Sequence, residues 1–271
     1  MDFIKNLDKD LQKALIIQLR NLWTHTSTAI EGNTLTLGET AFVLEEGLTV
    51  SGKPLKDHEE VVGHARAIDL LYGLLDQRTL LNEEALFSLH KTVQIHVIIE
   101  IYKPVGGWKK EPNSTVGVVD EKQVVFEYAA PKDVPSLMKQ WFKLYHELMA
   151  SAVPGDKKKA LQAYVALHVS FVSIHPFFDG NGRMARLVAN LPVLKAGLPP
   201  VIVPREHREA YIDALSQYHY AVGKIEKGEE LLPEPEALKP FAAFCKQAWR
   251  ASMDLMDEIH KKQQIRAGKG Q

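Results

Sequence analysis

The sequence has a single cysteine, no long apolar run and no excess of charge of either sign, and each shortage excludes a class of protein. With Cys245 alone, the 271-residue chain cannot close an internal disulfide. No apolar stretch approaches the ~18 residues of a membrane-spanning helix. The N-terminus also lacks a basic segment followed by an apolar one, so we expect no secretory signal peptide. Together these features predict a cytoplasmic protein without a membrane partner.

The balance of charge bears on nucleic acids. The chain carries 33 Lys and Arg residues and 34 Asp and Glu residues, which gives a formal net charge of −1. Domains that bind nucleic acid usually carry a clear excess of basic residues. We therefore expect no nucleic-acid partner.

Apolar residues recur at three- and four-residue spacing over most of the chain, which predicts an all-α protein. The first helix begins near Leu11 and should end at Gly32. A second clear stop is Gly197, which ends a helical run that starts after Arg183. The other predicted helices cover residues 57–75, 82–100, 132–150, 157–174 and 236–262.

No internal repeat or flexible linker divides the sequence, so we expect one helical domain with extensions at both ends. The predicted boundaries give an N-terminal helical region over residues 1–56, a core domain over 57–222 and a C-terminal helical extension over 223–271.

One segment departs from the helical pattern. Residues 115–119 and 123–128 are rich in β-branched and aromatic side chains, and a polar turn, Asp120-Glu121-Lys122, separates them. This arrangement predicts a β-hairpin. The hairpin is either a small structural decoration or part of a binding site.

Residues 175–186 read His-Pro-Phe-Phe-Asp-Gly-Asn-Gly-Arg-Met-Ala-Arg and carry the chemistry of the chain. Three loop positions can present backbone N–H groups to an anion, and they are Gly180, Asn181 and Gly182. The loop opens a helix, whose N-terminus favours negative charge. Arg183 and Arg186 lie three residues apart on its first turn. We predict a phosphate site.

Two side chains of the loop suit catalysis at phosphate. The ordinary pKa of histidine, near 6.5, suits His175 to act as a general base. Asp179 supplies one carboxylate, and one carboxylate together with phosphate oxygens is a common way to hold Mg²⁺. Phe177 is interpreted as an anchor in the core. His168 either orients a neighbouring group or, as we prefer, simply packs in its helix.

The stretch resembles the signature of the Fic (filamentation-induced-by-cAMP) family, H-x-F-x-[D/E]-G-N-G-R-x-x-R, at every fixed position. The resemblance implies a Fic-type helical bundle with the hairpin as a flap. It also implies transfer of AMP from ATP to a Ser, Thr or Tyr hydroxyl of a target protein or of the chain itself. His175 would be the base, Asp179 would hold Mg²⁺ or Mn²⁺, and the hairpin at 115–128 would dock the target.

The resemblance weakens around the nucleotide base and upstream of the hairpin. Tyr211 begins a segment similar to the family's Y-x-x-A-L helix, which lines the nucleotide. Many members then have an asparagine, where this chain has Tyr218 and His219; either could stack on a purine or pack within the helix. Upstream, Trp108-Lys109 stands where the family usually has [YF]-R. ATP is the expected nucleotide, with UTP and GTP left open.

A second motif lies far from the first. Residues 27–33 fit the inhibitory signature [S/T]-x-x-x-E-[G/N] of the Fic family, with Ser27 and Glu31 four residues apart on one helix face. The resemblance implies a subclass in which an N-terminal helix inhibits the site. We expect the Glu31 carboxylate to reach Arg186.

Several alternatives stay open at the level of sequence. The same site could remove AMP, with Glu31 activating a water molecule, or transfer another phosphate-containing group such as UMP or phosphocholine. A non-catalytic interaction module is a further alternative, and a homodimer is an open question of assembly.

Overall fold

The computed structural model describes residues 2–95, 103–119 and 121–268. The N-terminal half contains η1 (Asp2–Ile4), α1 (Lys9–Ile30), α2 (Leu37–Glu46), α3 (Leu55–Asp76), α4 (Glu83–Val93), β1 (Ser114–Val119) and β2 (Lys122–Glu127). The C-terminal half contains α5 (Val134–Ala150), α6 (Lys157–Ile174), α7 (Asn181–Val188), α8 (Leu191–Lys195), η2 (Arg205–His207), α9 (Arg208–Val222), η3 (Pro235–Leu238), α10 (Lys239–Ala248) and α11 (Arg250–Gly268). The predicted all-α fold with one hairpin is confirmed.

Helix α6 lies at the centre of the fold because its own side chains are apolar on nearly every face. It packs against α5, α7, α8 and α10. One cluster of buried apolar side chains runs from Phe3 to Ile259 and so draws on the N-terminal region, the core and the C-terminal extension. None of the described helices is both long and apolar enough to cross a membrane.

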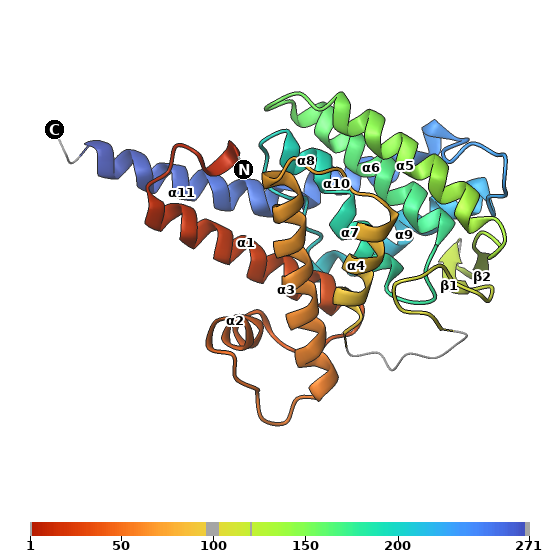
Figure 1. The fold of residues 1–271 in the computed structure, drawn as a ribbon, viewed down its shortest axis with the longest axis horizontal. Helices are drawn as coiled ribbons and strands as arrows, with labels where there is room; N and C mark the ends of the chain where they lie inside the picture. Colours follow the sequence, from red (N-terminus) through yellow and green to blue (C-terminus); the bar gives the residue numbers. More distant parts are fainter. Residues whose placement is uncertain (1, 96–102, 120, 269–271) are drawn as a thin grey trace.

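The first long helix and the last helix of the chain lie together. Helices α1 and α11 run side by side at one end of the molecule, and the hairpin lies at the other end (Figure 1). Arg266 of α11 forms an ion pair with Asp10 of α1, with 2.7 Å between nitrogen and oxygen. The far end of α1 reaches the middle of the bundle, where it contacts α7.

The hairpin is antiparallel, with Ser114 opposite Glu127 and Val119 opposite Lys122. Its strands agree with the predicted ones to within one residue. Lys122 belongs to β2 rather than to the turn, and Asp120 lies outside the described residues.

Three predicted helices have different bounds in the structure. Helix α4 ends at Val93, whereas we expected a helix to residue 100; residues 96–100 lie outside the described ranges. The run before Gly197 divides into α7 and α8 because Pro192 lacks the N–H that a continuous helix requires. The predicted helix over 236–262 divides into η3, α10 and α11.

Helix α2 was not predicted. Its N-terminus forms a capping box, in which the Thr36 side chain accepts from the backbone of Glu39 and the Glu39 carboxylate accepts from the backbone of Thr36. The Thr-x-x-Glu pattern was therefore readable in the sequence, but the helix has few apolar residues facing the core.

Candidate active site

A cavity of about 430 Å³ lies between the loop that follows α6, the hairpin, α9 and the C-terminal end of α1. This volume falls within the usual range for small-molecule sites. The predicted site residues that line it are Glu31, His175, Asp179, Gly180, Asn181, Gly182, Arg186 and Tyr211. Residues far apart in the sequence thus meet at one place.

His175 ends α6 in the left-handed conformation, with φ 52° and ψ 59°. Its Nδ1 lies 3.2 Å from the carbonyl oxygen of Val172. Because a carbonyl can only accept, Nδ1 carries the proton and Nε2 keeps its lone pair. Burial, together with the charge of Lys109, lowers the pKa of His175 to about 3. The imidazole is therefore neutral at pH 7 and able to accept a proton.

The aromatic ring of Tyr128 fixes the plane of this imidazole. The two ring centres lie 3.7 Å apart and the planes differ by 8°. Tyr128 is itself held at its hydroxyl, which lies 2.6 Å from the Thr115 hydroxyl across the hairpin. The hairpin thereby restrains the ring of the candidate base.

The loop before α7 is closed by Asn181. Its side chain accepts from the backbone N–H of Phe177 at 2.9 Å and donates to the carbonyl of Phe177 at 2.8 Å. Gly180 has φ 78°, and a Cβ there would lie 2.7 Å from the Gln94 amide nitrogen. Only glycine fits such a position easily. The result is a loop whose backbone lines the cavity at the N-terminus of α7.

Arg186 is the most heavily bonded side chain of the site. One guanidinium nitrogen donates to a carboxylate oxygen of Glu31 at 2.6 Å and to the backbone oxygen of Ser27 at 2.8 Å. Its Nε donates to the Ser27 hydroxyl at 3.0 Å, and a third nitrogen donates to the Tyr211 hydroxyl at 3.3 Å. The predicted contact between Glu31 and Arg186 is thus confirmed.

The end of α1 has little room around this contact. A Cβ on Gly182 would lie 2.6 Å from the Glu31 carboxylate, so the signature glycine leaves space for that group. Arg208 of α9 donates to the backbone oxygen of Ile30 at 2.7 Å. Glu31 is therefore held over the first turn of α7.

His168 both packs and orients a neighbour. The side chain is fully buried, as we preferred, and its Nε2 lies 3.0 Å from the Tyr211 hydroxyl. Tyr211 in turn accepts from Arg186. The histidine thus holds the tyrosine that lines the cavity.

Arg183 is buried beside the loop. It is not among the described residues that line the cavity, and its side chain is 4% exposed. Its guanidinium donates to the Gln94 side chain at 3.1 Å and lies 3.6 Å from Glu60 and 3.5 Å from Asp179. In this arrangement Arg183 supports the loop, and its contact with phosphate stays a prediction.

Asp179 faces the cavity with 64% of its side chain exposed. Although burial acts in the opposite direction, the charge of Arg183 lowers the pKa of Asp179, so the carboxylate is ionised at pH 7. Within the described parts of the chain, no three His, Cys, Asp or Glu side chains gather to hold a metal. The exposed carboxylate of Asp179 fits a divalent cation whose other ligands are substrate phosphates.

Sequence reasoning missed His90, which supports the loop from α4. Its Nε2 lies 3.0 Å from the backbone oxygen of Asp179, its Nδ1 accepts from the N–H of Gly106 at 2.8 Å, and its ring stacks on Phe177 at 3.8 Å. Phe177 is fully buried, as predicted. His90 and Gln94 are four residues apart, and this spacing was the available signal.

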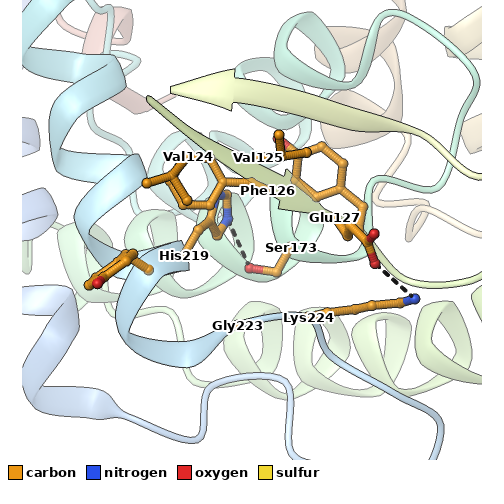
Figure 2. A pocket seen from close by; sticks show the side chains of 10 residues that line it. Val124, Val125, Phe126, Glu127, Ser173, His219, Gly223 and Lys224 are labelled. Carbon is orange, nitrogen blue, oxygen red and sulfur yellow. Dashed lines mark hydrogen bonds and ion pairs between the residues drawn. The ribbon is translucent and has the colours of Figure 1, made fainter. Parts of the chain in front are cut away.

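A second pocket, of about 240 Å³, lies between β2 and the end of α9, and we call it the hairpin pocket. Figure 2 shows His219 pointing to Ser173, with 3.2 Å between Nε2 and the hydroxyl, and Lys224 pointing to Glu127 at 3.7 Å. His219 lines both this pocket and the cavity, whereas Tyr218 is fully buried. Of the two candidates for contact with a base, His219 lines the described cavity and Tyr218 does not; contact with a base stays a prediction.

Comparison with known proteins agrees with this geometry. Residues 80–193 match the model of the Fic/DOC family. A Caenorhabditis briggsae protein named "Protein adenylyltransferase fic-1" is 34% identical over 197 residues, which are 72% of this chain and 36% of that relative. A Drosophila erecta protein named "Protein adenylyltransferase Fic" is 30% identical over 233 residues, or 84% of this chain and 40% of its own length.

The fold has a solved counterpart. A Fic domain containing signaling protein from Bacteroides thetaiotaomicron superimposes with a TM-score of 0.77 and 24% identity, over 94% of this chain and 93% of that one. The chain thus spans well under half of the curated relatives above but nearly all of this bacterial structure. By the match over residues 80–193 and by its similarity to the Fic proteins above, this chain belongs to the Fic/DOC family.

Proposed function

We propose that the protein is an adenylyltransferase that transfers AMP from ATP to a hydroxyl group of a target protein or of itself. One observation carries the proposal. The free Nε2 lone pair of a neutral His175 lies on the same cavity as the N-terminus of α7, Asp179 and Arg186. A base for a hydroxyl and a cradle for phosphates are the parts that this reaction needs.

In the proposed reaction the target hydroxyl oxygen attacks the α-phosphorus of ATP. His175 Nε2 takes the hydroxyl proton, the new O–P bond forms, and the bond to the pyrophosphate breaks. The backbone N–H groups at the start of α7 stabilise the negative charge that gathers on the phosphate oxygens. A divalent cation held by Asp179 and the phosphates, Mg²⁺ or Mn²⁺, would neutralise the charge of the leaving group.

The hairpin is the proposed docking site for the target. Three valines on it are more than half exposed, namely Val116, Val118 and Val125 at 64%, 54% and 62%. Isolated two-stranded sheets have free edges to which an extended segment can add. A target segment paired there would lie next to Tyr128 and the His175 ring that it stacks on.

The N-terminal region over residues 1–56 is the proposed inhibitory element of the domain. Its Glu31 engages the arginine that we assign to the terminal phosphate of ATP. A carboxylate–guanidinium pair is strong and directional. ATP could still enter, but its α-phosphate would be held away from in-line attack.

The deciding experiment incubates the purified chain with ATP and Mg²⁺ and searches for AMP adducts on intact protein and on lysate proteins by mass spectrometry. The variants are wild type, Glu31→Gly, and Glu31→Gly combined with His175→Ala. We expect adducts in the second and none in the third. Parallel reactions with UTP and GTP test the base, and adding a pre-modified target measures removal of AMP. A Glu31→Gly protein that binds ATP but forms no adduct with any nucleotide would refute the proposal.

A further inference from the structure

The turn that carries His175 is clamped by a segment about 65 residues earlier in the chain. The backbone N–H of Lys109 donates to the carbonyl of Pro176 at 2.9 Å. The Lys109 ammonium lies 3.4 Å from the carbonyl of Ile174, and Asn113 donates to the carbonyl of Phe177 at 2.9 Å. Carbonyls on both sides of His175 are therefore tied to one short segment.

The two clamping side chains are also tied to each other. The Lys109 ammonium donates to the side-chain oxygen of Asn113 at 2.6 Å. Because that bond fixes the amide oxygen as the acceptor, the amide nitrogen of Asn113 is left to donate to Phe177. Changing Lys109 should therefore disturb both contacts.

His175 needs such support because of its backbone. Its φ of 52° lies in the left-handed region, which residues with a Cβ seldom adopt and which is kept only when the surroundings impose it. Glycine would adopt it freely but would bring no imidazole. The direction of the imidazole into the cavity therefore depends on contacts that hold the turn.

Lys109 is placed unusually for a lysine. It is only 2% exposed, and among the residues that the structure describes no carboxylate forms an ion pair with it. Its ammonium lies 6.0 Å from the centre of the Tyr128 ring, which stacks on His175. A buried cation without a counter-ion is costly and calls for a role.

We propose that Lys109 is a positioning residue for His175, one that holds the 174–177 turn and the Tyr128–His175 stack so that the Nε2 lone pair of His175 faces the cavity. The inference rests on the proposed function only for the expected effect on kcat. The conformation and protonation of His175 can be measured without any turnover.

The charge of Lys109 supports this role. Burial is the main cause of the low pKa of His175, and Lys109 in its protonated form lowers that pKa further. Burial and the nearby charge of Lys224 lower the pKa of Lys109 itself to about 7. The other titratable groups that bear on this cluster are Asp179 on the loop, His219 on α9 and Tyr128 directly after β2. Lys224 is partly balanced by Glu127 across the hairpin pocket (Figure 2).

The test compares Lys109→Met and Lys109→Arg with a matched control, Lys110→Met, because Lys110 is the next residue and is exposed. All are made in the Glu31→Gly background. We measure thermal stability, ATP affinity by calorimetry, kcat and KM for ATP, and the tautomer and pKa of His175 by ¹⁵N NMR of the imidazole. Asn113→Ala is a second variant that removes one clamp contact without removing charge.

Lys109→Met should lower kcat by ~10–100-fold, since small misplacements of a reacting group have effects of that size. KM and ATP affinity should stay within about two-fold, Lys109→Arg should recover most of kcat, and Lys110→Met should match its parent. The pKa of His175 should rise in Lys109→Met and its Nδ1–H tautomer should become mixed. If Lys109→Met proves unfolded, the other two variants carry the test. The His175 tautomer should then become mixed in Asn113→Ala and stay unmixed in Lys109→Arg.

Two results would overturn the inference. One is unchanged His175 resonances in a folded Lys109→Met protein. If Lys109→Met does not fold, unchanged His175 resonances in Asn113→Ala count as the same result. The other is a parallel fall of kcat and ATP affinity, which would place Lys109 at the nucleotide. A parent protein without any transferase activity would refute the proposed function, while the NMR comparison would still decide the role of Lys109.

Discussion

Glu31 and Arg186 are 155 residues apart in the chain, yet their side chains meet at 2.6 Å. The contact joins the end of α1 to α7, the helix that the phosphate loop opens. Ser27, one turn earlier on α1, binds the same guanidinium through both its hydroxyl and its backbone oxygen. The guanidinium is thus engaged on several sides by the N-terminal region. Under the proposed function, a substrate phosphate would compete with Glu31 for this guanidinium.

Replacing Glu31 by glycine should therefore raise AMP transfer by about ten-fold or more, because Arg186 becomes available and the negative charge leaves the phosphate site. The measurement is the rate at which the protein incorporates label from radiolabelled ATP into itself. Glu46→Gly is the matched control, since Glu46 is an exposed glutamate that also ends a helix. Equal rates for Glu31→Gly and wild type, with both proteins folded, would remove the inhibitory role and leave the catalytic one untouched.

The sequence predicted the parts of the site that a local pattern can encode. Within residues 175–186 the Asn181 side chain bonds to the backbone of Phe177, and the four-residue spacing of Ser27 and Glu31 places both on one face of α1. The contact of Glu31 with Arg186 was also foreseen, through the resemblance to the Fic family. The hairpin was visible in its β-branched and aromatic residues on either side of a polar turn.

Other parts could not be read from the sequence because they depend on packing between distant elements. Arg183 has the spacing of a phosphate ligand, but its contacts with Gln94 after α4 and with Glu60 of α3 join elements far apart in the chain. Similarly, nothing in the residues around Lys109 shows that they meet the 174–177 turn. The helix breaks near Pro192 could have been expected from proline itself.

His175→Ala should reduce transfer by ~10²–10⁴-fold, the usual effect of losing a general base. ATP affinity should change little, because the imidazole handles the proton of the target hydroxyl rather than the nucleotide. Activity in the Glu31→Gly background and calorimetry with ATP measure the two effects. His146→Ala, at an exposed position of α5, is the control. Transfer at the parent rate would assign the base elsewhere.

Asp179→Ala should weaken binding of the divalent cation, since Asp179 is the more exposed of the two carboxylates, Asp179 and Glu31, that line the cavity in the described structure. We expect the concentration of Mg²⁺ that gives half-maximal rate to rise about ten-fold or more. Titration of Mg²⁺ at saturating ATP provides the measurement, and Asp179→Asn keeps the size of the side chain. Full activity in excess EDTA would contradict the role of a metal altogether.

Val118→Pro in β1 should lower transfer to protein targets while ATP binding is retained, because proline removes a backbone donor and the strand geometry that an added segment would use. Val118→Thr keeps both and is the control. For each variant we compare the labelling of lysate proteins with the affinity for ATP. A parallel loss of both properties would instead identify the hairpin as a structural support for Tyr128.

The stability of the fold should depend on pH in a window set by its buried histidines. Burial lowers the pKa of His90 and of His219 to about 4, and that of His64 lies well below its ordinary value for the same reason. An unfolded chain protonates these groups near pH 6.5, whereas the native protein does not. Between about pH 6.5 and 4 the unfolded state thus binds more protons, so the free energy of unfolding falls as the pH falls.

Each such histidine contributes a slope of up to ~1.4 kcal/mol per pH unit in that window and none above it. We therefore expect a plateau of stability from pH 7 to 8 and a steep decline below pH 6, measured by urea unfolding at each pH. His64→Phe isolates one contribution. The ring of His64 is fully buried near Trp23, and neither of its nitrogens has a hydrogen-bond partner, so phenylalanine removes a titrating group without removing a bond. The variant should lose one such contribution to the slope; a slope identical to wild type would show that His64 is not neutral in the native protein.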